Sequence, residues 1–126
     1  MTQSAVIVTG AANGIRYACA HDLLTDGVPV AATDIGEIPA ALVNAGDCLP
    51  LSFDVSAEKS CQEAVKTATA RFGGVRALIH FAGIHHTKTW DEVTGEDFAH
   101  VYAVNVTGFF LMARAAAGQM QDSGGS

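Results

Sequence analysis

Residues 5–16 read AVIVTGAANGIR, an apolar run that passes through a glycine-rich turn into a helical pattern. The run Ala5–Val8 is continuously apolar and rich in β-branched residues, which is typical of a strand covered on both faces of a sheet. After the turn, apolar residues recur at helical spacing as far as Asp26-Gly27, which end the pattern. A strand, a glycine turn and a helix in this order favour a parallel α/β sheet whose first turn can approach a phosphate group.

Three further apolar runs repeat this alternation along the chain. Besides Ala5–Val8, the predicted strands are 28–33, 49–53 and 75–81, and the predicted helices are 15–25, 39–45, 56–72 and 94–120. Ser56 is the expected cap of the third helix. Four strands alternating with four helices indicate a doubly wound parallel sheet with helices on both faces. The predicted fold class is therefore α/β, in one domain that covers residues 1–126.

The composition excludes several classes of partner. Hydrophobic residues make up 49%, charged residues make up 16%, and the formal net charge is −6. No basic stripe offsets phosphate repulsion, so a nucleic-acid partner is not expected. No apolar run approaches the ~20 residues of a membrane span, and no basic segment precedes the first run, so neither a membrane partner nor a signal peptide is expected. Three cysteines without paired spacing fit reduced thiols in a cytoplasmic protein.

Aspartates end two of the predicted strands. Asp34 follows the second strand and Asp54 the third, at the carboxyl edge where open α/β sheets bind ligands. A carboxylate at Asp34 can accept hydrogen bonds from both hydroxyls of an adenosine ribose and would repel a 2′-phosphate, which favours NAD over NADP. The alternatives are a plain tight turn at Gly10 to Gly14 and a surface role for Asp34.

The order and spacing of these motifs resemble the short-chain dehydrogenase/reductase family along nearly the whole chain. Thr9-Gly10-x-x-x-Gly14-Ile15 resembles its glycine motif, Asp54-Val55 its adenine-contacting pair, Ala82-Gly83 the end of its Asn-Asn-Ala-Gly motif, and Asn105 the asparagine of its catalytic tetrad. The resemblance implies a Rossmann-type sheet with strand order 3-2-1-4. It also implies an oxidoreductase that moves a hydride between NAD and an alcohol or ketone carbon.

The resemblance also implies roles for individual residues. The dinucleotide would be contacted by Gly10, Asn13, Gly14, Ile15, Asp34, Asp54, Val55, Ala82 and Gly83. Asn105 would help hold a water molecule in the family's proton relay. The alternative for Asn105 is a helix residue that bonds only to nearby backbone. The short stretch between Asp34 and Asp54 is similar in length to that of members that form aromatic diols.

Three departures from the family pattern affect the expected activity. Arg16 replaces a third glycine, and its side chain should crowd the dinucleotide or turn to solvent, with steric hindrance the expected outcome. His80-Phe81 replace an asparagine pair, and Phe81 is expected in the core. The family's serine and Tyr-x-x-x-Lys motif are absent, because they follow a fifth strand that the 126 residues do not reach. We therefore expect a cofactor-binding half, truncated before strand five, that is inactive alone.

Association is expected from two apolar surfaces. The last predicted helix carries apolar residues around nearly its whole circumference, which indicates packing on the sheet and on a second surface, from more chain or from another subunit. Without a fifth strand, residues 77–81 form an exposed apolar edge. We expect a homo-oligomer through this edge and that helix.

Two other functions stay open. The chain could be a non-catalytic nucleotide-binding or self-associating interaction module, or a structural assembly domain. Adjacent His85 and His86 lie in a polar loop that should border the substrate pocket. No metal site is expected there, because no third ligand has suitable spacing.

Overall fold

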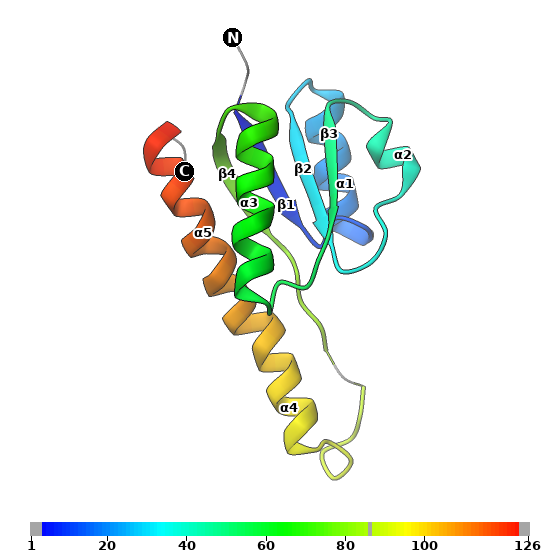
Figure 1. Cartoon of the computed structure of the whole chain (residues 1–126). Coiled ribbons are helices and arrows are strands. Elements are labelled where there is room, and N and C mark those ends of the chain that lie inside the picture. The colour runs from blue at the N-terminus through cyan, green and yellow to red at the C-terminus, as the bar shows by residue number, and fades with distance from the viewer. Residues whose placement is uncertain (1–3, 86, 124–126) are drawn as a thin grey trace.

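The sheet has four parallel strands. The structure is a computed structural model that describes residues 4–85 and 87–123 (Figure 1). The strands lie in the order β3-β2-β1-β4, and each neighbouring pair is parallel. This confirms the predicted fold class and strand order. The strands are β1 Ala5–Thr9, β2 Val30–Asp34, β3 Cys48–Ser52 and β4 Val75–His80.

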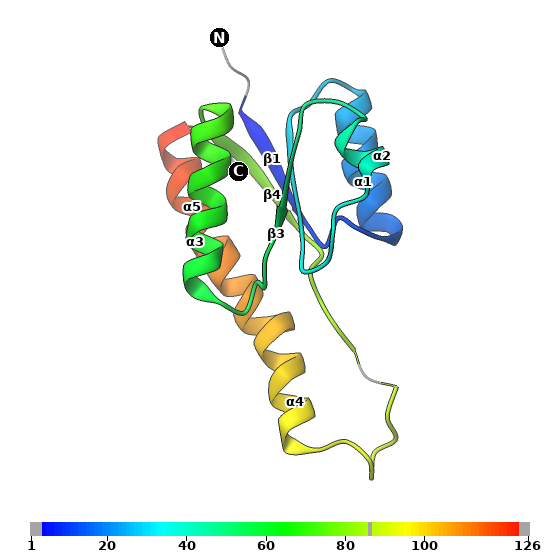
Figure 2. The same cartoon turned by 45° about the vertical axis from the view of Figure 1, so that its right-hand side comes forward.

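Helices cover both faces of the sheet, as Figure 2 shows. On one face lie α1 and α2, and on the other lie α3 and α5, while α4 extends past the carboxyl end of the strands. A π-helical turn, η1, separates α4 from α5. The helical segments are α1 Gly14–Thr25, α2 Ala40–Val43, α3 Glu58–Phe72, α4 Gly95–Tyr102, η1 Ala103–Thr107 and α5 Gly108–Ser123.

The central strand β1 divides the core into two halves. All five of its residues are buried. Ala5 and Ile7 pack in the cluster that includes α3 and α5, and Val6 and Val8 pack in the cluster that includes α1 and α2. Successive side chains of a strand point to opposite faces, so a strand covered on both sides must be apolar throughout. The continuously apolar run at the start of the sequence therefore indicates a strand inside the sheet, where β1 lies between β2 and β4.

The prediction for the start of α3 was wrong. The N-cap is Ala57, and no side chain caps it. Ser56 instead turns back to the third strand's aspartate, because its backbone N–H and its hydroxyl both donate to Oδ1 of Asp54, at 2.9 and 2.7 Å. Ser56 therefore holds the turn after β3 rather than the helix.

The long C-terminal helix also differs from its prediction. It is interrupted by η1, and its outward side is exposed in this chain rather than buried on several sides. Only its inward residues, such as Leu111, Met112 and Ala116, join the core with α3 and the sheet. Contrary to expectation, the run Gly95–Gln121 is long and apolar enough to cross a membrane by length and composition. That criterion is weak, because core helices of water-soluble proteins meet it too.

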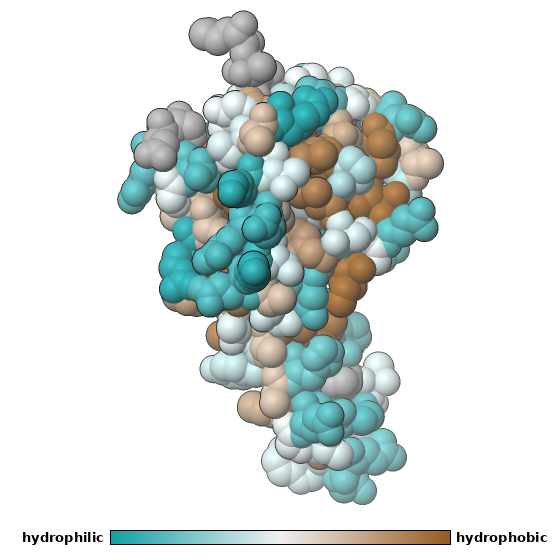
Figure 3. Space-filling model, viewed as in Figure 1, coloured by the Kyte–Doolittle hydropathy of each residue, from teal (hydrophilic) through white to brown (hydrophobic). Residues whose placement is uncertain are grey.

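Figure 3 shows how apolar and polar surface divide on the face seen in Figure 1. Hydrophobic side chains gather over β3 and α2, and hydrophilic side chains cover the outer side of α3. The polar outer side of α3 agrees with its buried stripe of Cys61, Val65, Ala68 and Phe72 on the opposite side. The helix thus presents an ordinary amphipathic pattern to water and to the sheet.

Candidate functional site

A small cavity lies at the carboxyl edge of the sheet. Its volume is about 90 Å³, and loops after all four strands contribute to it, together with α1, α4 and η1. Six of the predicted residues line it, which are Gly10, Asp34, Asp54, Val55, Ala82 and Gly83. Six more residues that line it were not predicted as contacts, which are Arg16, Ile35, Phe53, Ile84, His100 and Val104. The cavity therefore brings these six predicted residues together at one edge of the sheet.

The carboxylate of Asp34 is held in place by two backbone groups. The N–H of Ala12 donates to Oδ2 and the N–H of Gly36 donates to Oδ1, both at 3.0 Å. A carboxylate has about four acceptor positions, so each oxygen keeps one for another donor. Ile35, beside it, is 72% exposed. A fixed carboxylate next to an exposed apolar side chain suits a ribose with an aromatic base attached to it.

The turn between β1 and α1 offers an anion site. Gly10 and Gly14 have φ angles of 69° and 62°, a region that L side chains rarely adopt. Asn13 is the N-cap of α1, but its side chain makes no capping hydrogen bond, and the first turn holds no acidic residue. Free amides and the helix dipole at such an end attract phosphate. Asn13, Gly14 and Ile15 lie in this first turn, beside the cavity rather than in its wall.

The pKa of Asp54 lies below its ordinary value. The N–H and hydroxyl of Ser56 lower the pKa of Asp54, and nearby His100 contributes in the same direction. Val55 is buried, and its carbonyl and side chain lie against Gly108. The turn after β3 is thus fixed from both ends, by Ser56 on one side and by the C-terminal helix on the other.

Thr9 organises the segment after β4. Its hydroxyl oxygen accepts hydrogen bonds from the N–H groups of Phe81 and Ala82, at 2.9 and 3.1 Å, and lies 3.0 Å from Nδ1 of His80. A hydroxyl has two acceptor positions and one proton, so the proton must point to Nδ1 and the imidazole must carry its own proton on Nε2. Burial lowers the pKa of His80, which favours this neutral form. The Phe81 side chain is 39% exposed, so its predicted place in the core was wrong.

Asn105 binds the loop that follows Gly83. Its Oδ1 accepts from the N–H of Ile84 and its Nδ2 donates to the carbonyl of Ile84, both at 2.7 Å. Both of these bonds go to backbone, as the alternative reading expected, but the backbone belongs to a loop 21 positions away in the sequence rather than to the helix of Asn105. Its Oδ1 also lies 3.3 Å from where a Cβ on Gly83 would be, so a larger residue there would have to shift the Asn105 side chain slightly. The proton-relay role stays a prediction.

Arg16 lies inside the site. Its Nη1 donates to the carbonyl of Phe81 at 3.2 Å, and its Cδ lies 3.0 Å from the position of a Cβ on Gly10. The sequence predicted that the Arg16 side chain would either crowd the dinucleotide or turn to solvent. In the structure it lies at the cavity and helps to line it. The side chain crosses from the first turn of α1 to the end of β4.

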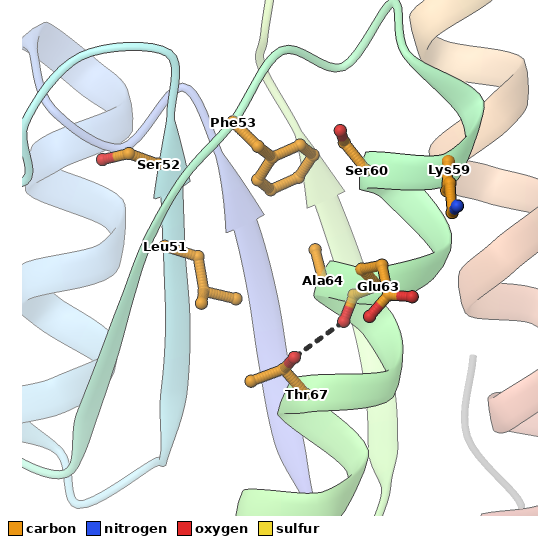
Figure 4. A pocket seen from close by; sticks show the side chains of 8 residues that line it. All are labelled: Leu51, Ser52, Phe53, Lys59, Ser60, Glu63, Ala64 and Thr67. Carbon is orange, nitrogen blue, oxygen red and sulfur yellow. Dashed lines mark hydrogen bonds between the residues drawn. The ribbon is translucent and has the colours of Figure 1, made fainter.

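A larger cavity lies elsewhere. It has a volume of about 410 Å³ and is formed by the end of β3 and by α3 (Figure 4). Leu51, Phe53 and Ala64 point into it, while Lys59 points away. Only Phe53 also borders the smaller cavity, and none of the predicted contacts lines the larger one.

The loop after Gly83 carries no metal cluster within the described part of the chain. His85 is exposed, and His86 lies outside the described residues. Nowhere in residues 4–85 and 87–123 do three His, Cys, Asp or Glu side chains gather as a metal site. Lys88 pairs instead with Asp97, at 2.7 Å, which joins the loop to the start of α4.

Comparison with known proteins identifies the family. The family model described as short chain dehydrogenase matches residues 4–126. This chain belongs to the short-chain dehydrogenase family. It is 32% identical to D-threitol dehydrogenase of Mycolicibacterium smegmatis, over 94% of this chain and 48% of that protein. It is 33% identical to 2,5-dichloro-2,5-cyclohexadiene-1,4-diol dehydrogenase LinX of Sphingobium indicum, over 94% of this chain and 50% of that protein.

The solved structures agree with this assignment. A short-chain dehydrogenase/reductase mutant from Serratia marcescens superimposes with a TM-score of 0.83 at 27% identity, over 94% of this chain and 51% of that one. The chain therefore spans about half the length of the short-chain dehydrogenases it matches. The family implies a nicotinamide dinucleotide as cofactor.

The residues at the edge fit such a cofactor. Gly10 provides close approach of backbone, α1 provides an uncapped N-terminus, and Asp34 provides a fixed carboxylate. Asp34 would hold the adenosine ribose, the first turn of α1 the pyrophosphate, and Ala82-Gly83 the far ribose. Arg16 also lines this edge, and its Nη1 donates to the carbonyl of Phe81.

Two of the six lining residues that the sequence did not predict, Ile35 and His100, were missed for different reasons. The sequence did contain a signal for Ile35. This apolar residue stands between the strand-ending Asp34 and Gly36, where a buried side chain is not expected. His100 had none, because its place depends on the direction in which α4 leaves the loop. Only the fold brings His100 beside Asp54.

Proposed function

We propose that this chain is the cofactor-binding half of an NAD-dependent oxidoreductase that interconverts an alcohol and a carbonyl compound. The observation that carries the proposal is the Asp34 carboxylate, fixed by two backbone N–H groups at the end of β2. A negative charge with free acceptor positions favours a ribose with two hydroxyls over a ribose 2′-phosphate, since the phosphate would be repelled. NAD is accordingly the proposed cofactor.

The protein's part in this chemistry is positioning. When bound, the nicotinamide would accept or supply the hydride. Ala82 and Gly83 would lie along the nicotinamide ribose, held there by Thr9 and by the Asn105 clamp on Ile84. Neither tyrosine is followed by lysine four positions later, since His21 follows Tyr17 and Val106 follows Tyr102. We therefore propose that these 126 residues bind cofactor without catalysing hydride transfer by themselves.

The proposed substrate class is a secondary alcohol that bears a second hydroxyl. Two of the relatives carry a polyol or a diol in their names, D-threitol and a dichlorocyclohexadiene diol. The shared family supports this substrate class, through a match that covers about half of each of these two relatives. Oxidation assays with a set of polyols, on a protein that joins this sequence to a family Ser and Tyr-x-x-x-Lys motif, would test it.

The cofactor proposal is tested by titrating NADH and NADPH against the wild-type chain and Asp34→Asn. Wild type should bind NADH more tightly than NADPH. Asp34→Asn should weaken NADH binding by about tenfold, or ~1.4 kcal/mol, and should narrow the preference over NADPH, because the charge is gone. Asp26→Asn removes an exposed aspartate at the other end of α1 and is the matched control.

Equal binding of both cofactors by wild type would contradict the preference for NAD. Binding of neither would contradict a cofactor-binding role and would favour an assembly domain. A second candidate function, a nucleotide-binding module without catalysis in the whole protein, is favoured by Arg16 in the groove. It predicts NADH binding without turnover in any protein that contains this sequence.

A further inference from the structure

The side chain of Arg16 divides the groove at the carboxyl edge into two parts. Its stem lies over Gly10, with Cδ and Nη1 at 3.0 and 3.2 Å from the position of a Cβ on that glycine. Its Nη1 then reaches the carbonyl of Phe81 on the opposite side, at 3.2 Å. The amide nitrogen of Ala82 also lies 3.2 Å from the Gly10 Cβ position, so the two lips of the groove are close here.

The two parts differ in chemistry. One part holds Asp34, exposed Ile35 and Asp54, which suit an adenosine. The other part holds the backbone of Ala82, Gly83 and Ile84, which suits the far half of a dinucleotide. A chain that runs through both parts must pass the position that the Arg16 stem occupies. A ligand that ends at its second phosphate need not pass it.

We propose that Arg16 is a gate that leaves the adenosine part open and closes the far part, so that the resting groove accepts an adenosine 5′-diphosphate group and a whole dinucleotide must displace the gate. The proposal rests on the proposed function, since it concerns the same cofactor site. The guanidinium lies beside the uncapped N-terminus of α1, and together they offer a charge-assisted partner for a terminal phosphate. A terminal phosphate carries more charge than the diester of a dinucleotide, which further favours the diphosphate.

The gate can open because little holds it shut. Its hydrogen bond within the described residues runs to a neutral carbonyl in an exposed position. Among the described residues no ion pair is formed by Arg16, whereas Arg71 and Arg114 each pair with a carboxylate. Rotation of the side chain toward solvent would free the Gly10 backbone without any change in the fold.

Calorimetric titration with ADP and with NADH tests the gate in wild type, Arg16→Gly and Arg16→Ala. Both substitutions should tighten NADH binding by about fivefold and weaken ADP binding by about threefold, so the ratio of the NADH to the ADP dissociation constant should fall by about fifteenfold. Equal changes in affinity in the two variants would show that loss of the arginine side chain causes them, rather than added backbone freedom at glycine. Arg71→Ala removes a surface arginine outside the groove and should leave both constants unchanged.

The outcomes separate the gate from the proposed function. If both ligands bind and the ratio is the same in wild type and the Arg16 variants, the gate is overturned while the cofactor site stands. If Arg16→Ala weakens NADH binding, Arg16 is a contact of the pyrophosphate and the gate is overturned. If neither ligand binds any variant, the cofactor site itself fails, and the gate fails with it.

Discussion

The hydroxyl of Thr9 uses all three of its hydrogen-bonding positions at once. Two backbone N–H groups and one imidazole nitrogen surround it, and this set joins β1 to the segment that runs along the cofactor groove. Nε2 of His80 is buried and lacks a hydrogen-bond partner in the described structure, and the ring packs edge-on against Phe109. A protonated His80 would point a second proton at the Thr9 proton, so the network requires the neutral ring.

This network predicts a stability that depends on pH. The pKa of His80 is lowered in the folded chain by burial. Below the ordinary histidine pKa of about 6.5, the unfolded chain therefore binds more protons than the folded chain does. The contribution of neutral His80 to the free energy of unfolding is complete above that pH and is lost as the pH falls through the pKa of the folded chain. Urea unfolding at about pH 7.5 and pH 5.5 should show a larger drop in midpoint for wild type than for His80→Asn, whose amide can accept from Thr9 without titrating.

The control for that measurement is His85→Asn, which removes an exposed loop histidine. It should retain the wild-type pH dependence. An equal drop in His80→Asn and wild type would mean that other titrating groups cause the loss and that the Thr9 network does not depend on the charge of His80.

At the scale of elements, a glycine sets how closely the C-terminal helix approaches the turn after β3. A Cβ on Gly108 would lie 2.8 Å from Cγ2 of Val55 and 3.3 Å from its carbonyl oxygen. The π-helical turn ends here, with the N–H of Gly108 bonded to the carbonyl of Ala103. Because π turns insert a residue, they change which side chains face inward, and η1 places Asn105 against the loop and Gly108 against Val55.

Gly108→Ala should therefore destabilise the chain by about 1–3 kcal/mol, since overpacking must push the helix or Val55 aside. Gly118→Ala is the matched control in the same helix, where a Cβ would meet nothing within 4 Å. It should be neutral or stabilising by up to ~1 kcal/mol, because alanine is the better helix former. Chemical unfolding of the two variants gives the comparison, and equal stabilities would show that α5 is not held close by this glycine.

At the scale of the whole molecule, an apolar face stays uncovered. The residues Phe98, Tyr102, Val106, Phe109 and Phe110 are exposed along α4, η1 and the start of α5. They recur at helical spacing on the outward side of a helix whose inward side already packs on α3 and β4. Contiguous apolar patches of this kind on a soluble chain mark interaction surfaces or association hazards.

We propose that a second copy of the chain covers this face, so the 126 residues should sediment as a dimer or larger species at micromolar concentration. Phe98→Asp with Phe110→Asp should shift the distribution toward monomer, because two charges would have to be buried. Trp90→Asp is the control, since Trp90 is fully exposed in the loop and lies outside the helix. A monodisperse wild-type monomer with cooperative unfolding would contradict the proposal.

Much of the fold and part of the site could be predicted because those features are local. A buried central strand must be apolar throughout, which made Ala5–Thr9 visible, and turns with positive φ call for glycine, which made Gly10 visible. Strand-ending acids share one edge in any parallel sheet, so Asp34 and Asp54 could be placed together. Ser56 and Phe81 were predicted wrongly because each was assigned from its immediate neighbours, while a partner elsewhere decided its position.

The sequence by itself determined the alternation of strands and helices, the glycine turn and the acids at the sheet edge, since each follows from spacing and backbone preference along the chain. The strand order also followed from it, through the resemblance to the family. Only the tertiary structure decided where Arg16 points, what Asn105 binds and how Thr9 holds the segment after β4. These contacts join residues that are 21 to 73 positions apart in the sequence, so no local pattern encodes them. They come from the packing of α1 and the C-terminal helix around the end of β4, which exists only once the sheet has formed.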